Sequence, residues 1–238
     1  MNKHIKFNED WIRWEIRNKV PGIYELRILM SDFYNTKLSC YFHTDDPDPM
    51  IRQMMAWNYP PDCCINHYLT INPVKEYCEA REQFNSLRKT KIMTDEADIA
   101  RLTWFAVDVD PEHPRGTSAS DEEKEEARKQ AVEVTHYMQE LGFSYPEIVD
   151  SGNGYHLKYR IDLDNTPENR ELLRNMNRSL SAKFPLIDAS VKDVSRVLKL
   201  PGTMAMKGRS TPERPFRMAR ILRDPLGLDE GRGSGDVK

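Results

Sequence analysis

The order of strand and helix signals after residue 100 constrains the fold of this chain more than any other feature of its sequence. An apolar run over Leu102–Val107 predicts a buried or half-buried strand. A capping box formed by Ser120 and Glu123 then begins an amphipathic helix, whose apolar residues recur at spacings of three and four until Gly142 ends it. The segment therefore begins with one strand and one long helix.

Two further strand signals flank the glycine-rich turn "DSGNG" at 150–154, which predicts a β-hairpin. Thr166 and Pro167 begin a second helix, and a last strand candidate lies within 184–201. The order is therefore strand, helix, strand, strand, helix, strand. This is the split βαββαβ pattern of a ferredoxin-like α+β sheet.

Residues 1–98 precede this sheet and mix short apolar runs with polar breaks. Within it, Asn72 and Pro73 have the chemistry of an N-cap and a first helical position, so a helix is expected over residues 73–89. We predict an N-terminal α/β subdomain at 1–98, a second subdomain at 99–226 and a flexible tail at 227–238.

Composition narrows the class of protein. The chain has 238 residues, of which 31% are charged, and no apolar stretch approaches the ~20 residues that a membrane span needs. Its first residues lack an apolar core, so no signal peptide is expected. The net charge of −3 gives no overall basic footprint for nucleic acid, although a local groove can still be basic.

The cysteines have no regular spacing, which argues against a disulfide scaffold and for a reducing compartment such as the cytoplasm. Cys63, Cys64 and Cys78 are the residues that zinc would need. The usual pair of cysteines two residues apart is missing, so we favour buried free thiols and leave a zinc site open.

The predicted topology gathers chemically active residues at one edge of the sheet. In a βαββαβ sheet, the first and third strands are antiparallel neighbours and the fourth strand flanks the first. The end of the first strand carries Asp108 and Asp110, while the third strand begins near His156 and the fourth near Asp188. Three carboxylates and one imidazole are therefore expected to converge.

Three neighbouring carboxylates repel one another unless cations neutralise them. Mg²⁺ and Mn²⁺ prefer oxygen ligands, and two such ions about 3.5–4 Å apart can clamp the attacking and leaving oxygens of a phosphoryl transfer. We therefore predict Asp108, Asp110 and Asp188 as ligands of Mg²⁺ or Mn²⁺. An isolated D-x-D is more often a surface turn, and the expected convergence with Asp188 and His156 favours the metal site.

A basic row is expected beside the carboxylates. His156, Lys158 and Arg160 share one face of the third strand, and the N–H groups of the glycine turn before it would face a phosphate. Arg196, Lys199 and Lys207 follow along the chain as further candidate phosphate contacts. The alternative for these residues is a solvated surface, and Lys207 is the weakest candidate.

Three segments carry a family resemblance. "FAVDVDP", "DSGNGYHLKYRIDL" and "IDASVKDVSRVLKLPGT" resemble, in order and spacing, the three motifs of the archaeo-eukaryotic primase superfamily. The resemblance is greatest to the primase–polymerases of phages, plasmids and other mobile elements. "YLTINPV", "GIYELRIL" and "MKGRSTPERPFR" also fit that subgroup, so the resemblance covers nearly the whole chain.

The resemblance implies an RRM-like catalytic sheet packed against an N-terminal α/β unit. It implies that Asp108, Asp110 and Asp188 are the metal ligands. It also places Ser151 and His156 in the motif that contacts the phosphates of the incoming nucleotide, and Arg196 and Lys199 at further triphosphate contacts. The implied site of action is the cytoplasm of a bacterial or archaeal host. Family members often carry a helicase or zinc-binding module, which is not recognisable here, so a helicase fused elsewhere or acting in trans is expected.

The expected function is template-directed synthesis and extension of primers on single-stranded DNA from nucleoside triphosphates. Two alternatives stay open. A metal-dependent nuclease or replication initiator would need a general base or a tyrosine nucleophile beside the metals, and Tyr155 is expected on the core face. A non-catalytic RRM-like module would expose aromatic residues on the open face of its sheet, where the sequence places basic residues instead.

Overall fold

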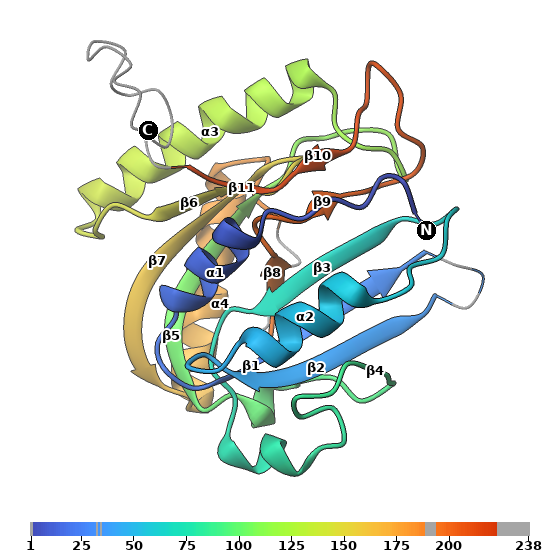
Figure 1. Ribbon diagram of the computed structural model, residues 1–238. Coiled ribbons are helices and arrows are strands. Elements are labelled where there is room, and N and C mark those ends of the chain that lie inside the picture. The colour runs from blue at the N-terminus through green and yellow to red at the C-terminus, as the bar shows by residue number, and fades with distance from the viewer. Residues whose placement is uncertain (1, 32, 34, 189–193, 223–238) are drawn as a thin grey trace, which may run out of the picture.

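The chain has a mixed α+β fold with two antiparallel sheets. The computed structural model describes residues 2–31, 33, 35–188 and 194–222. Figure 1 shows the N-terminal sheet in blue and cyan beside the second sheet in green and yellow. No helix within these ranges is long and apolar enough to cross a membrane.

The N-terminal sheet has the strand order β4-β2-β1-β3-β8, and its last strand comes from the distant second half of the chain. Helices α1 and α2 accompany it, together with two short 3₁₀ segments. The bounds are α1 (Glu9–Arg17), β1 (Ile23–Met30), β2 (Lys37–His43), α2 (Asp48–Ala56), β3 (Ile65–Thr70), η1 (Glu76–Ala80), β4 (Arg88–Lys89) and η2 (Glu96–Asp98).

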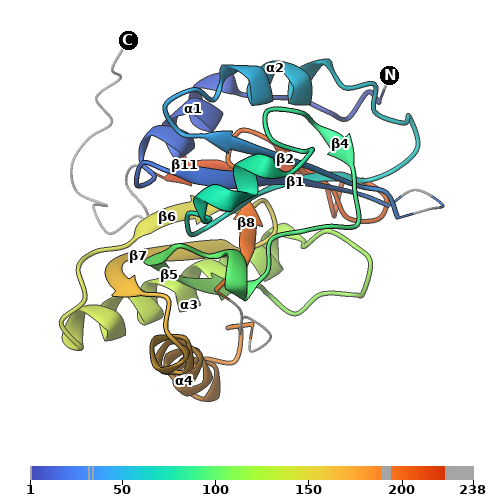
Figure 2. The ribbon, with the colours of Figure 1, turned by 90° about the horizontal axis from the view of Figure 1, so that it is seen from below.

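The second sheet has the order β11-β6-β7-β5, and a separate ribbon pairs β9 with β10. Helices α3 and α4 cover one face of the second sheet, and the opposite face turns toward the N-terminal unit (Figure 2). The bounds are β5 (Arg101–Val109), α3 (Asp121–Glu140), β6 (Glu147–Asp150), β7 (Tyr155–Asp164), α4 (Pro167–Lys183), β8 (Val197–Lys199), β9 (Met204–Ala205), β10 (Arg217–Met218) and β11 (Arg220–Leu222).

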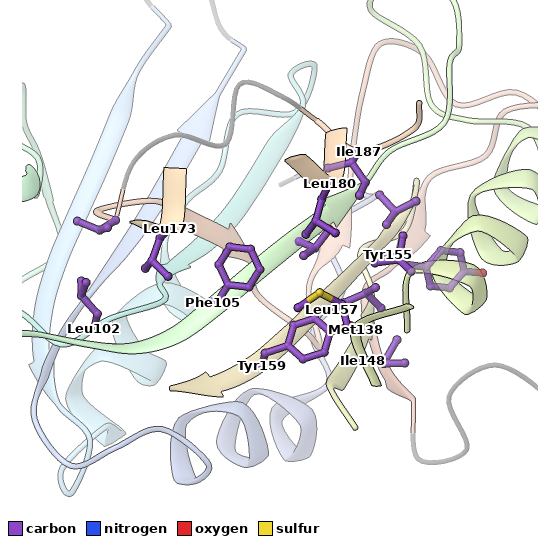
Figure 3. Close-up of a cluster of buried hydrophobic side chains, with 14 of the residues drawn as sticks. Leu102, Phe105, Met138, Ile148, Tyr155, Leu157, Tyr159, Leu173, Leu180 and Ile187 are labelled. Atoms are coloured by element: carbon purple, nitrogen blue, oxygen red, sulfur yellow. The ribbon is translucent and has the colours of Figure 1, made fainter. Parts of the chain in front are cut away.

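The predicted signals from residue 101 to 183 are confirmed. Ser120 caps α3, because its side chain accepts from the N–H of Glu123 while the Glu123 carboxylate accepts from the N–H of Ser120. Thr166 caps α4 in the predicted way. Apolar side chains on one face of β5 and β7, including Phe105, Leu157 and Tyr159, pack with the two helices in one core (Figure 3).

The predicted fourth strand is wrong in part, because the described strand of this segment, β8, lies in the other sheet, and residues 189–193 lie outside the described residues. Among the described residues, an antiparallel bridge joins Ile187 to Val109 at the edge of β5, where the topology requires the fourth strand. The longer strand of this region, β8, leaves that sheet and pairs with β3 instead. Leu198 of β8 packs there with Ile71 and Ala106, so apolar burial between the two sheets accompanies this pairing.

The helix expected over residues 73–89 is also wrong, since only the five-residue η1 forms. The Asn72 side chain does not cap a helix. Its Oδ1 accepts from the N–H groups of Thr103 and Trp104 in β5, at 2.8 and 3.1 Å. Val74 is extended, because it forms isolated bridges with Ile23 and Ile99. Long-range backbone pairing therefore overrides the local helix signal.

Buried ion pairs join α1 to the second sheet. Lys158 on β7 lies 2.8 Å from Glu15 of α1 and 3.0 Å from Glu147 of β6, and all three side chains are largely buried. A buried charge is tolerated only when it is paired, so this contact ties the two units together. The boundary near residue 98 stays a prediction, and the tail at 227–238 lies outside the described residues.

Candidate active site

Strand register sets the backbone of the site. Asp108, near the end of β5, is directly opposite His156, near the start of β7, and Val109 is opposite Tyr155. On the other side of β5, the N–H of Asp188 donates to the carbonyl oxygen of Asp108 over 3.0 Å. The backbone positions expected to converge therefore lie side by side.

A cavity of about 260 Å³ opens at this edge. Six of the eight predicted site residues line it: Asp108, Asp110, Ser151, His156, Lys199 and Lys207. The other wall comes from β3, which contributes Asn66 and Tyr68. The cavity thus lies between the two sheets and takes side chains from both.

The remaining two predicted residues, Arg196 and Asp188, lie beside Asp108. Nη2 of Arg196 lies 2.9 Å from Oδ2 of Asp108 and 3.2 Å from Oδ2 of Asp188. One guanidinium nitrogen therefore bridges two of the predicted metal ligands. Within the described ranges, no group of three or more His, Cys, Asp or Glu side chains is arranged to hold one metal ion, so the ligand set stays a prediction.

The charge balance around Asp110 suits an additional cation. Burial raises the pKa of the Asp110 carboxyl, and the neighbouring Asp108 carboxylate raises it further, whereas Lys207 and His113 act in the opposite direction. Carboxylate oxygens are the ligands that Mg²⁺ and Mn²⁺ prefer. The donor set and its unbalanced negative charge therefore fit a hard divalent cation.

Lys199 places a buried amino group on the other side of the cavity. Its side chain is buried, and Nζ donates to the carbonyl oxygen of Met204 at 2.6 Å and to Oδ1 of Asn66 at 3.2 Å. Burial lowers its pKa well below the ordinary value. No carboxylate in the described part of the chain forms an ion pair with it, so an anion in the cavity would supply the missing partner.

His156 lies between these two regions. Its Nε2 is 3.5 Å from Oδ1 of Asp108, and burial lowers the pKa of the imidazole although Asp108 opposes that effect. The buried Nδ1 has no hydrogen-bond partner among the described residues. A buried nitrogen without a partner is costly, which suits a polar ligand at this point.

The rest of the expected basic row does not reach the cavity. Lys158 is paired with Glu15 and Glu147, as described above. The guanidinium of Arg160 stacks on Trp104, with 4.1 Å from its carbon to the ring centroid, and donates to the carbonyl oxygen of Asn18. The expectation of a phosphate-facing row is therefore wrong beyond His156, because α1 covers this face of the sheet.

The glycine turn has a different role from the one expected. The N–H of Gly152 donates to the Asp150 side chain at 2.8 Å, and the N–H of Gly154 donates to Oγ of Ser151 at 3.0 Å. These donors are engaged within the turn and do not face a phosphate. A Cβ atom at Gly154 would lie 2.1 Å from the carbonyl oxygen of Val109, so glycine allows the turn to approach the end of β5.

Sequence reasoning missed the contribution of β3. Asn66 and Tyr68 are two residues apart on β3, so their side chains lie on the same face of the strand, as "INHYLT" already indicates. No local sequence signal, however, indicates that β3 lies beside β5. Burial raises the pKa of Tyr68 to about 12, and the carboxylates of Asp108 and Asp110 contribute to the shift. The phenol is therefore held in its neutral form.

Two further cavities continue from the first and form a groove. The second, about 430 Å³, shares Asn66, Tyr68, Met206 and Lys207 with the first. The third, about 640 Å³, shares Cys64, Gly116, Met206 and Gly208 with the second. We call this continuous surface the basic groove, because its basic side chains outnumber its acidic ones away from Asp108 and Asp110; they are Lys3, Lys37, Lys207 and Arg209, against Asp62.

The cysteines considered for zinc are divided between two cores. Cys63 and Cys64 pack against the core of the N-terminal sheet, whereas Cys78 is buried in the core of the second sheet. Cys64 also lines the basic groove, where its Sγ lies 3.1 Å from the carbonyl oxygen of Gly208. This separation gives no support to a zinc site built from the three thiols.

Comparisons with known proteins add little to this geometry. A scan against protein-family models finds no match, and a search of curated proteins finds no significant match. Among solved structures, the chain is similar to the primase RepB′, with a TM-score of 0.49 and 12% sequence identity. The alignment covers 92% of this chain and 56% of that one, so this chain spans little more than half of the RepB′ length.

Proposed function

We propose that this chain is a primase–polymerase of the archaeo-eukaryotic primase superfamily, a nucleotidyltransferase that makes and extends primers on single-stranded DNA. The observation that carries the proposal is that acidic and basic side chains line opposite sides of one cavity. Asp108 and Asp110 offer oxygen ligands on one side, and Lys199 is buried without a carboxylate partner on the other. A nucleoside triphosphate with its divalent cations matches both sides.

In this proposal, Asp108, Asp110 and Asp188 would hold Mg²⁺ or Mn²⁺. When bound, the ions would lower the pKa of the primer 3′-hydroxyl and offset charge on the leaving oxygens. Lys199 and Lys207 act as point charges for the phosphates, and His156 lines the cavity beside them. The basic groove gives a phosphate backbone a route to the cavity, which supports single-stranded DNA as the template.

Tyrosine chemistry is the main rival, because Tyr68 lines the same cavity as the carboxylates. A nuclease or replication initiator that uses a tyrosine nucleophile needs the phenolate. The neighbouring carboxylates and burial instead raise the pKa of Tyr68 to about 12, which disfavours that form. Tyr155 is unsuited, since it belongs to the core of the second sheet.

A non-catalytic RRM-like module is disfavoured by the covered face of the sheet. Such modules stack bases on exposed aromatic side chains. Here Trp104 lies beneath Arg160 and is 5% exposed, and Lys158 is bound to α1. The face that would receive RNA or DNA is therefore occupied by the N-terminal unit.

The test is a template-dependent extension assay on single-stranded DNA, with ribo- or deoxynucleotides and with Mg²⁺ or Mn²⁺ in parallel. The Asp110→Asn variant should be inactive. Asp164→Asn is the matched control, because Asp164 lies at the opposite end of the β5–β7 pair and is exposed. Absence of extension by the wild type under every combination would overturn the proposal. A helicase partner and a cytoplasmic location in a bacterial or archaeal host are further parts of it.

A further inference from the structure

We propose that Arg196 competes with divalent cations for Asp108 and Asp188, and that a nucleoside triphosphate relieves this competition by drawing the guanidinium away. The inference rests on the proposed function and adds a regulation of the same site. It makes metal and nucleotide binding mutually dependent through one side chain.

The first observation is the shared use of carboxylate oxygens. A single nitrogen of Arg196, Nη2, lies 2.9 Å from Oδ2 of Asp108 and 3.2 Å from Oδ2 of Asp188. A cation that approaches either oxygen meets the positive charge of the same guanidinium, which opposes its binding. The backbone hydrogen bond from Asp188 to Asp108 keeps both carboxylates within reach of the same guanidinium.

The second observation is that the contact can be broken without unfolding. The side chains of Arg196, Asp108 and Asp188 are 21%, 18% and 35% exposed, so water can reach all three. Ion pairs with this degree of exposure contribute modestly to stability. The backbone of Arg196 stays fixed meanwhile, because its carbonyl oxygen accepts from the N–H of Ile71 at 3.1 Å.

The third observation is where the guanidinium acts. It contacts the Asp108 carboxylate, which lines the cavity together with Tyr68 and His156. An anion in that cavity is thus within the electrostatic range of Arg196. Because guanidinium groups bind phosphate oxygens strongly, a triphosphate gives the displaced side chain a new partner.

The consequence is positive coupling between the two ligands. A divalent cation alone binds against the positive charge of Arg196, whereas in the presence of a triphosphate the guanidinium can leave the carboxylates for a new ion pair. Coupling of this kind is reciprocal, so the metal should raise the affinity for nucleotide by the same factor.

The experiment measures Mn²⁺ binding by calorimetry, with and without a nucleoside triphosphate, for the wild type and for Arg196→Ala. Removal of the competing charge should tighten the binding of Mn²⁺ alone by roughly threefold to tenfold. The same variant should bind nucleotide more weakly and lose most of the coupling. Arg196→Lys retains the charge, so its affinities for Mn²⁺ and nucleotide should lie between those of the wild type and those of Arg196→Ala. Arg88→Ala is the matched control, because that exposed arginine donates to Ser86 and lies outside the cavity.

Opposite changes in the affinities for Mn²⁺ and nucleotide would support the competition, since a damaged fold would weaken both. If Arg196→Ala binds Mn²⁺ no more tightly than the wild type, the competition is refuted. A wild type that still extends primers would then leave the proposed function intact. If neither protein binds Mn²⁺ under any condition, the competition and the metal-dependent function both fail.

Discussion

The N–H of Asp188 donates to the carbonyl oxygen of Asp108 over 3.0 Å, and this hydrogen bond places a carboxylate that follows α4 beside one that ends β5. Eighty residues separate the two positions in the chain. Next to this hydrogen bond, the bridge between Ile187 and Val109 lies at the edge of β5 where a ferredoxin-like sheet has its fourth strand. The predictions below depend on this edge and on the cavity that it borders.

Asp110→Asn should abolish primer extension and stabilise the fold near neutral pH. Because the folded-state pKa of Asp110 is raised, the folded protein binds this proton more tightly than the unfolded chain, and stability falls as pH rises above the ordinary value of 3.8. Asparagine carries no ionisable proton, so the variant should have a higher melting temperature than the wild type at pH 7. The difference between the two melting temperatures should disappear below pH 3.8. Thermal melts across pH measure the difference.

The same thermal melts test whether Asp110 binds a divalent metal ion. Mn²⁺ should stabilise the wild type by binding the folded state and should stabilise Asp110→Asn much less. Asp164→Asn should respond to Mn²⁺ as the wild type does, since that carboxylate is exposed at the far end of the sheet. Identical responses of wild type and Asp110→Asn would remove Asp110 from the metal site.

Lys199→Met should weaken nucleotide binding while it stabilises the protein. A lost charge-assisted phosphate contact is worth roughly 1.5–3 kcal/mol, or about tenfold to a hundredfold in affinity. The pKa of Lys199 is lowered in the folded protein, so the unfolded chain takes up the proton first as pH falls below 10.5. The stabilisation by methionine should therefore increase toward neutral pH, as urea unfolding at several pH values would show. An unchanged nucleotide affinity would make this lysine a purely structural residue.

His156→Ala should weaken nucleotide binding more than DNA binding. The buried Nδ1 has no hydrogen-bond partner among the described residues, and the ring lines the cavity that we assign to the phosphates. Filter binding of a radiolabelled nucleotide and of a single-stranded oligonucleotide gives both affinities. Equal losses for the two ligands, or a loss for DNA alone, would place His156 outside the nucleotide site.

Lys37→Ala and Arg209→Ala should weaken binding of single-stranded DNA and reduce its salt dependence. Each lost phosphate contact should lower the slope of log affinity against log salt by about 0.7. Both residues line the basic groove. Lys129 is the control, because it is exposed on α3 outside the three cavities. Salt titrations that give the same slope for all variants would mean that the single-stranded DNA binds outside the basic groove.

Tyr68→Phe should retain primer extension, since the neutral phenol has no place in the proposed chemistry. Metal, template and nucleotide contacts of the other residues stay in place in this variant. A nuclease with a tyrosine nucleophile would lose all strand cleavage on the same change. Parallel extension and cleavage assays therefore distinguish the two functions, and cleavage that disappears in Tyr68→Phe would favour the rival.

The sequence predicts much of this fold because its signals are local. The capping box at Ser120, the cap at Thr166 and the turn at 150–154 each act over a few residues, and each forms as predicted. Register then follows from the alternation of side chains along β5 and β7, which places Asp108 opposite His156.

The failures have non-local causes. Asn72 and Pro73 have helix-start chemistry, yet the Asn72 amide binds the backbone of β5, thirty-one residues away at Thr103. β8 finds its partner in β3, and nothing within "RVLKLPG" specifies that choice. For the same reason, the position of Asn66 and Tyr68 beside the carboxylates depends on how the two sheets pack, and the sequences of β3 and β5 do not predict it.

The return of β8 to β3 also limits how a gene of this kind can be rearranged. The strand that carries Lys199 is encoded after the carboxylates but completes the sheet encoded before them. A recombination event that exchanged only the segment from β5 onward would join β8 to a foreign β3, and the cavity would lose the match between its two walls. The two units are therefore expected to have been inherited together, as a single evolutionary module.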